Sequence, residues 1–184
     1  LKNEKYRRKV ASILPLIHMI SLRESKVSLP LLKSIGISLD KVTVTGDDAV
    51  ELAYNKRPEE IGQSIGINLR VAKYSNVTDD SVKALKEVIQ KFAIDKDIAL
   101  LPVPIDRASF SQYIDSDITS IQKLLQDFDD KSDGGLSLDT PTKVIQEVGK
   151  CRVLVTGSYH GGVFALSQGI PVIGLAKSQY YIDK

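Results

Sequence analysis

The sequence predicts an α/β protein built on a Rossmann-like parallel sheet with helices on both faces. From residue 65 onward, short apolar runs rich in β-branched residues alternate with amphipathic helical patterns. The strands expected near residues 65, 97, 152 and 170 are separated by helical segments, which is typical of parallel strands with right-handed crossovers. The last part, Val153 to Leu175, reads as strand, glycine-flanked polar turn, short helix and strand, which is one half of a doubly wound sheet.

The first part of the chain has a less regular pattern of short elements. Pro15 should end a basic amphipathic helix, and Ser28 and Gly36 should mark the beginning and end of a second helix. The expected elements are a helix at 1–14, a strand at 16–22, a helix at 28–35, a strand at 41–45 and a helix at 49–55.

The second part repeats strand and helix regularly. Val82, Leu85, Ile89 and Phe92 recur with helical spacing, and Thr140 before Pro141 is a typical helix start. The expected elements are strands at 65–69, 97–103, 153–156 and 170–175, and helices at 80–93, 115–128, 141–148 and 163–167.

Composition excludes several classes of function. The net charge is +2 and 26% of residues are charged with both signs interspersed, so there is no basic footprint for nucleic acid. A single cysteine, Cys151, precludes an internal disulfide and fits a reducing compartment such as the cytoplasm. No apolar run approaches the ~18 residues of a membrane span.

A charged, proline-containing stretch near residues 57–60 predicts a linker. We therefore expect residues 1–58 to be the tail of an N-terminal domain with its interdomain connection. Residues 59–184 would form a C-terminal Rossmann-like domain that binds a donor. Because the chain starts at Leu1 and stops at Lys184 within an element, we also expect it to be a piece of a longer protein, truncated in its last domain.

The candidate site is the predicted turn from Gly157 to Gly162. His160 would lie at a strand end, where its imidazole suits proton transfer or contact with an anion at neutral pH. Glycines 157, 161 and 162 would let a ligand approach the backbone, beside Ser158 and the N–H groups of a helix start. The alternative is a tight turn that needs glycine for positive φ and carries an incidental histidine.

Two further positions are candidates for anion contact. Asn68 and Arg70 lie at the end of the first strand of the same sheet, and arginine presents a planar fork to carboxylate or phosphate. Lys184 follows the last strand, where it would neutralise a phosphate or remain solvated. No metal site is expected, because His18, His160 and Cys151 have no ligand spacing. His18 and Cys151 are interpreted as buried core residues.

The order of these motifs resembles the polysaccharide pyruvyl transferase family. Its C-terminal signature has a strand, Arg-x-His, a helix of small residues, Gly-x-Pro, a strand and a lysine. The corresponding residues here are Ser158-Tyr159-His160, Val163-Phe164-Ala165-Leu166, Gly169-Ile170-Pro171, Val172-Ile173 and Lys184. Segments 20–25, 32–37 with 42–48, and 65–70 resemble earlier elements of the family in the same order.

The resemblance implies a transferase of two-domain, glycosyltransferase-B-like (GT-B-like) architecture, of which this chain would be the C-terminal part. The implied reaction moves enolpyruvate from phosphoenolpyruvate to a saccharide hydroxyl during synthesis of a cell-surface polysaccharide. No other cofactor is implied. Arg70, Lys184 and the helix start at Gly161-Gly162 would hold the donor's charges, and a lipid-linked acceptor would bring the enzyme to a membrane surface.

One position departs from the family signature. Ser158 stands where the family has an arginine two residues before the histidine. A neutral hydroxyl therefore replaces a guanidinium that would contact an anion. This departure keeps two alternatives open: a GT-B-like glycosyltransferase that uses a nucleotide-sugar, and a carbohydrate-binding relative without catalysis.

Overall fold

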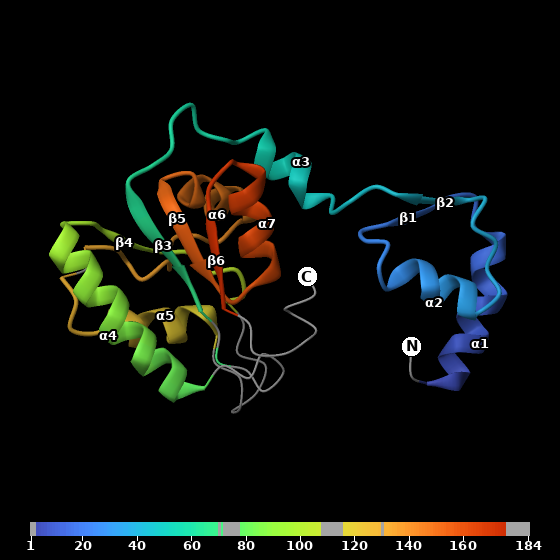
Figure 1. Cartoon of the computed structure of the whole chain (residues 1–184), viewed down its shortest axis with the longest axis horizontal. Helices are drawn as coiled ribbons and strands as arrows, with labels where there is room; N and C mark the ends of the chain where they lie inside the picture. Colours follow the sequence, from blue (N-terminus) through green and yellow to red (C-terminus); the bar gives the residue numbers. More distant parts are fainter. Residues whose placement is uncertain (1–2, 70, 72–77, 108–115, 130, 176–184) are drawn as a thin grey trace. The chain divides into compact units, whose positions relative to one another are not determined.

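The computed structural model of the chain describes residues 3–69, 71, 78–107, 116–129 and 131–175 (Figure 1). The chain divides into two compact units, Leu1–Val50 and Glu51–Lys184. The assignment of residues 1–58 to the tail of an N-terminal domain and of 59–184 to a donor-binding domain stays a prediction.

The first unit pairs short helices with a two-stranded parallel sheet. Its elements are α1 (Glu4–Ile13), the 3-10 helix η1 (Leu14–Leu16), β1 (Ile20–Leu22), α2 (Ser28–Ser34) and β2 (Val42–Val44), and α3 (Ala49–Tyr54) crosses into the second unit. Strand β1 pairs with β2, with Ile20 opposite Val42.

The predicted strand at 16–22 is wrong over its first half. Pro15 and Leu16 lie in the 3-10 helix η1 instead of in a strand. Leu16 is 83% exposed. The parallel ladder begins only where β2 supplies a partner, with the Ile20 N–H donating to Lys41 O at 2.7 Å. The interpretation of His18 as a core residue is also wrong, because its side chain is exposed.

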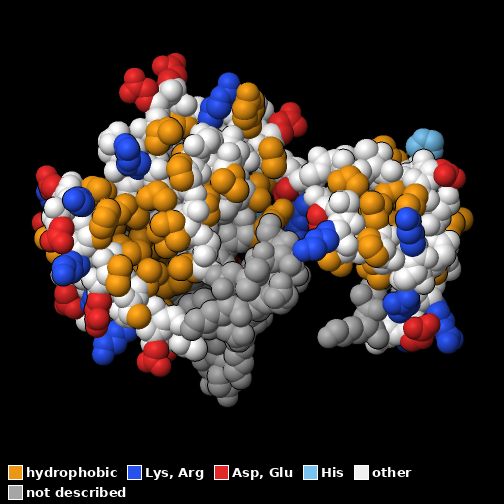
Figure 2. All heavy atoms as spheres, viewed as in Figure 1, with side chains coloured by type: hydrophobic (Ala, Val, Ile, Leu, Met, Phe, Trp, Pro, Cys, Tyr) orange, Lys and Arg blue, Asp and Glu red, His pale blue; other side chains and the backbone are white. Residues whose placement is uncertain are grey.

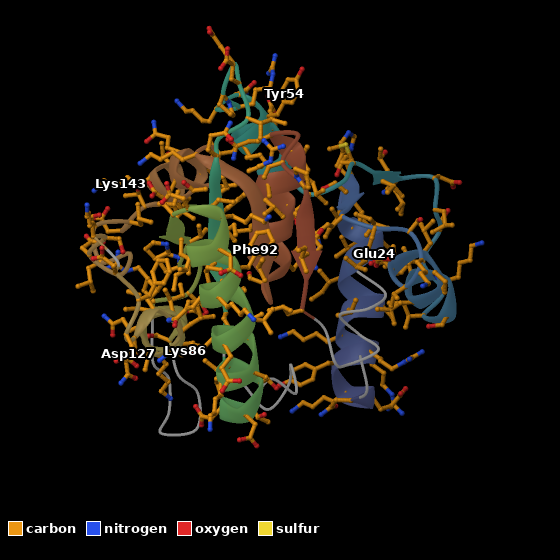
Figure 3. All side chains as sticks on the ribbon, turned by 60° about the vertical axis from the view of Figure 1, so that its left-hand side comes forward. Glu24, Tyr54, Lys86, Phe92, Asp127 and Lys143 are labelled. Carbon is orange, nitrogen blue, oxygen red and sulfur yellow. The ribbon has the colours of Figure 1, made fainter. Side chains whose placement is uncertain are left out.

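The start of α2 is capped by a residue that the sequence pattern did not indicate. The carboxylate of Glu24, labelled in Figure 3, accepts hydrogen bonds from the N–H groups of Val27 and Ser28 at 2.8 and 2.9 Å and from the Ser28 hydroxyl. The bond from the Ser28 hydroxyl, followed by that from Val27, holds the pKa of Glu24 below its usual value. Ser28 therefore supports the cap instead of being the cap itself.

The second unit is an α/β layer with a four-stranded sheet. Its strands are β3 (Ser64–Asn68), β4 (Leu100–Pro102), β5 (Cys151–Thr156) and β6 (Val172–Gly174), and its main helices are α4 (Asp79–Lys96), α5 (Asp117–Leu125), α6 (Pro141–Val148) and α7 (Tyr159–Ser167). The strand order is β4-β3-β5-β6, and every pair is parallel. This confirms the α/β class and is compatible with a Rossmann-like sheet.

Helices cover both faces of this sheet (Figure 1). Helix α4 packs against α5, and α6 packs against α7. Strand β5 alternates between the two layers. Val155 joins the core cluster beneath α4 and α5, whereas Leu154 and Thr156 meet α7 at Gly161.

Several predicted boundaries shift for a local reason. Helix α4 extends to Lys96 and closes at Asp97, whose φ of 54° is left-handed, so β4 begins later than residue 97. Helix α5 ends at Leu125, two residues before Asp127, whose φ is 67°. Phe92 is 49% exposed and Ala93 takes its predicted core position at 1%, because the buried stripe of a 3.6-residue helix drifts over several turns.

Ion pairs and apolar side chains share the surface around α4. Lys86 and Asp127 point toward one another, with Lys86 Nζ 2.9 Å from Asp127 Oδ2 (Figure 3). This ion pair links α4 to the turn after α5. Figure 2 shows hydrophobic side chains gathered on the face of this unit that carries α4. Among the residues of α4, Val88 and Ile94 are 68% and 69% exposed. Across the described parts of the chain, every helix is either too short or too polar to span a lipid bilayer.

Replacing Gly66 with alanine should lower the free energy of unfolding by about 1–3 kcal/mol. A Cβ there would lie 2.6 Å from Cys151 Sγ and 2.7 Å from Leu154 Cδ1, both in the buried core. Gly174→Ala is the matched control, because a Cβ on that strand glycine meets nothing within 4 Å. Urea titration of both variants measures the difference, and equal stabilities would contradict the packing argument.

Cys151 should resist thiol reagents in the native protein. Burial raises the pKa of its thiol to about 12, compared with ~8.5 for a free cysteine. The stabilisation from keeping the thiol neutral is therefore fully present below pH ~8.5 and is lost as pH rises toward 12. We expect slow labelling by Ellman's reagent at pH 8 and fast, complete labelling in urea. Fast labelling of the folded protein would show that the thiol is accessible.

Candidate active site

The candidate site lies at the carboxyl edge of the four-stranded sheet. The chain places β4 on one side of β3 and β5 on the other, so the connections after β3 and β5 diverge at this edge. Parallel α/β sheets bind ligands outside the strand ends at such a switch point. Asn68 ends β3 and Thr156 ends β5, and the two residues are direct neighbours in the ladder.

A buried hydrogen-bond network joins these strand ends. The Thr156 hydroxyl donates to Asn68 Oδ1 at 2.7 Å, and Asn68 Nδ2 donates to Val103 O at 2.9 Å and to Asp117 Oδ2 at 2.8 Å. Asn68 is fully buried. Since both ends of its amide are engaged, Asn68 aligns the ends of three strands; this gives the predicted ligand-binding residue a structural role.

Asp117 is a buried residue of this edge that sequence reasoning missed. It lies in the first turn of α5, is 1% exposed, and its Oδ2 also accepts the N–H groups of Ile105 and Asp106 at 2.8 and 2.9 Å. The carboxylate thus fixes the loop that follows β4. Its amide partner Asn68 lies 49 residues away in sequence, so no local spacing could have revealed it.

The predicted turn at 157–162 is shorter than expected. Helix α7 begins at Tyr159 with Ser158 as its N-cap, so His160, Gly161 and Gly162 lie within its first turns and not in a loop. The Ser158 N–H donates to the Thr156 hydroxyl at 3.0 Å, and the Gly157 N–H donates to Asn68 O at 3.0 Å. Because these bonds complete the turn in two residues, the helix starts four residues earlier than predicted.

The glycines of this segment are not there for positive φ, since all three have other backbone conformations. A Cβ on Gly161 would lie 2.5 Å from Thr156 Oγ1, so this glycine lets α7 approach β5 closely. Gly162 faces open space, and Gly157 lies near Leu175 O. The prediction that Gly157, Gly161 and Gly162 contact a ligand stays untested, with a packing role now evident for Gly161.

His160 has an exposed side chain in the first turn of α7. Its ring centroid lies 5.4 Å from that of Tyr159 and 6.3 Å from that of Phe164. It lines a cavity of about 160 Å³ together with Pro104, Ile105, Arg107, Leu138, Asp139, Thr140, Pro141, Val144 and Phe164. His160 therefore belongs to a concave surface and stays the candidate catalytic group.

Structure brings together six of the eight predicted site residues at this edge. They are Asn68, Gly157, Ser158, His160, Gly161 and Gly162. Arg70 and Lys184 lie outside the described residues. Within the described ranges, no group of three or more His, Cys, Asp or Glu side chains is arranged to hold a metal ion.

Fold and site together define an α/β protein whose candidate site lies where the parallel strands end. A helix N-terminus there offers N–H groups to an anion, and an imidazole beside it is suited to proton transfer. The profile of one protein family, described as polysaccharide pyruvyl transferase, matches residues 1–179.

The chain belongs to the polysaccharide pyruvyl transferase family and is by that membership a transferase. This confirms the resemblance seen in the motifs. No curated protein and no solved structure matches the chain significantly.

Thr156→Val should destabilise the fold by about 1–3 kcal/mol, because Asn68 Oδ1 loses its buried donor. Thr156→Ser keeps the hydroxyl and should recover most of that loss. Chemical denaturation of the three proteins makes the comparison. A valine variant as stable as the wild type would contradict the argument, because valine removes only the hydroxyl that donates to Asn68 Oδ1.

Proposed function

We propose that this enzyme transfers enolpyruvate from phosphoenolpyruvate to a saccharide and forms a pyruvyl ketal during synthesis of a cell-surface polysaccharide. The proposal takes the class of reaction from the family. Within that class, the placement of His160 is the observation that supports it. Its imidazole lies on a concave surface in the first turn of α7, beside backbone N–H groups that favour an anion.

The proposed chemistry has two bond-forming steps. One sugar hydroxyl adds to C2 of the enolpyruvate while a proton is delivered to its methylene carbon, which becomes a methyl group. A second hydroxyl then displaces inorganic phosphate at C2 and completes the ketal. His160 would move a proton in one of these steps, and Arg70 and Lys184 would contribute positive charge to the donor's carboxylate and phosphate.

Ser158 is the reason for keeping a second candidate function. A hydroxyl replaces the family arginine, and Ser158 occupies the N-cap of α7 without a capping bond from its side chain. With less positive charge at this point, a nucleotide-sugar is an alternative donor, and the reaction would then be glycosyl transfer. Either reaction suits our further proposal that the Glu51–Lys184 unit is the C-terminal half of a GT-B-like enzyme.

The setting follows from the proposed substrates. In the cytoplasm the enzyme would meet phosphoenolpyruvate. A lipid-linked saccharide acceptor would bring the enzyme to the inner surface of the membrane. This association would be peripheral and would depend on the acceptor.

His160→Asn should lower kcat for phosphate release from phosphoenolpyruvate by at least about 100-fold, within the range typical of a lost acid–base group. His18→Asn is the matched control, because His18 is an exposed histidine of the other unit. The assay measures inorganic phosphate with the full chain and a glycan acceptor pool.

Thermal shift adds a second readout for the same proposal. Millimolar phosphoenolpyruvate should raise Tm of the wild-type protein, and uridine or guanosine diphosphate should not. A rise in Tm with the nucleotide but not with phosphoenolpyruvate would support glycosyl transfer and contradict pyruvyl transfer. Full activity of His160→Asn would remove His160 from the chemistry.

A further inference from the structure

We propose that the cavity beside His160 binds one sugar ring of the acceptor, so that the Glu51–Lys184 unit itself carries an acceptor subsite. The inference rests on the proposed function, because it concerns the saccharide of that reaction. Three segments far apart in sequence form the cavity: the loop after β4, the segment that leads into α6, and the first turns of α7.

The cavity walls are largely apolar. Pro104, Val144 and Phe164 are buried, and Ile105 and Leu138 are partly buried. Pyranose rings present a face of C–H groups that packs on aliphatic and aromatic side chains, and ligand pockets combine such walls with a few polar groups. The aromatic pair of Phe164 and His160, 6.3 Å apart, offers a surface of this kind.

Two charged side chains lie among the cavity's lining residues. Arg107 Nη2 donates to Leu136 O at 2.9 Å, and Asp139 Oδ1 accepts from Lys143 Nζ at 2.8 Å. Lys143, labelled in Figure 3, extends from the first turn of α6. A carboxylate and a guanidinium in the lining of one cavity can accept from and donate to sugar hydroxyls.

The Asp139 carboxylate is charged and is paired with cations. Hydrogen bonding and charge attraction from Lys143, with a smaller effect of Arg107, hold the pKa of Asp139 below its usual value. Asp139 is therefore ionised at neutral pH, and the positive charges of Lys143 and Arg107 balance it. A neutral polyhydroxylated ring can hydrogen-bond to such opposite charges, and the donor is expected on the side of Gly157 and Ser158.

The size of the cavity suits a single ring. Its volume is about 160 Å³, compared with roughly 300–1,000 Å³ for pockets that hold drug-sized ligands. His160 is part of the wall, so a hydroxyl of a bound ring would face its imidazole. This assigns the proton transfer of His160 to the acceptor hydroxyl, with His160 as the base.

Histidine NMR on the full chain tests the subsite directly. The sequence has two histidines, so ¹⁵N-histidine labelling gives two sets of ring signals, and His18→Asn assigns them. The probes are the methyl pyranosides of glucose, galactose, mannose and N-acetylglucosamine, titrated to tens of millimolar without phosphoenolpyruvate. At least one should shift the ring signals of His160 and leave those of His18 unchanged.

A matched pair of variants locates the binding site. Asp139→Asn should raise the Kd of the shifting glycoside at least five-fold, because the amide oxygen accepts more weakly than a carboxylate. Asp79→Asn is the control, because Asp79 is also exposed and its Oδ1 forms a comparable ion pair with Lys123 Nζ at 3.0 Å. This variant should leave Kd unchanged. Circular dichroism checks that both variants keep the fold.

The outcomes separate this inference from the proposed function. Shifts of His160 with phosphoenolpyruvate but with none of the glycosides would overturn the sugar subsite and leave pyruvyl transfer standing. Shifts with a glycoside but not with phosphoenolpyruvate would keep the subsite and reject the donor. If no probe shifts the ring signals of His160, or if Asp139→Asn leaves Kd unchanged, the proposed subsite is also overturned.

Discussion

The buried amide of Asn68 is the interaction on which the edge of the sheet depends. It receives the hydroxyl of Thr156 from β5 and donates both to the β4 end at Val103 and to the carboxylate of Asp117. An amide can satisfy donors and acceptors at once, which an apolar residue at this position cannot do. In the fully buried interior, leaving these groups unpaired would cost more than the bonds themselves contribute.

The network connects the sheet to the surface where ligands are expected. Asp117 holds the loop after β4, and that loop supplies Pro104, Ile105 and Arg107 to the cavity. Thr156 receives the Ser158 N–H and meets Gly161, which places the first turn of α7 and therefore His160. A single set of buried bonds thus positions both the histidine and the opposite wall of the cavity.

The sequence predicted the alternation of strands and helices because apolar periodicity reflects burial, and burial is local in a helix or strand. It also located His160 and Asn68 at the strand edge. Boundaries were less predictable where backbone conformation or a distant partner decided them. Asp97 closes α4 through left-handed φ, Glu24 caps α2, and Thr156 lets α7 begin at Tyr159.

By itself, the sequence determined the α/β class, the family and the stretch around His160, because periodicity and motif order survive without coordinates. Only the tertiary structure revealed the role of Asp117, the packing reason for Gly161 and the cavity that joins His160 to Arg107 and Asp139. These residues are dozens of positions apart along the chain. Parallel strand order brings them to one edge, and no local pattern encodes that proximity.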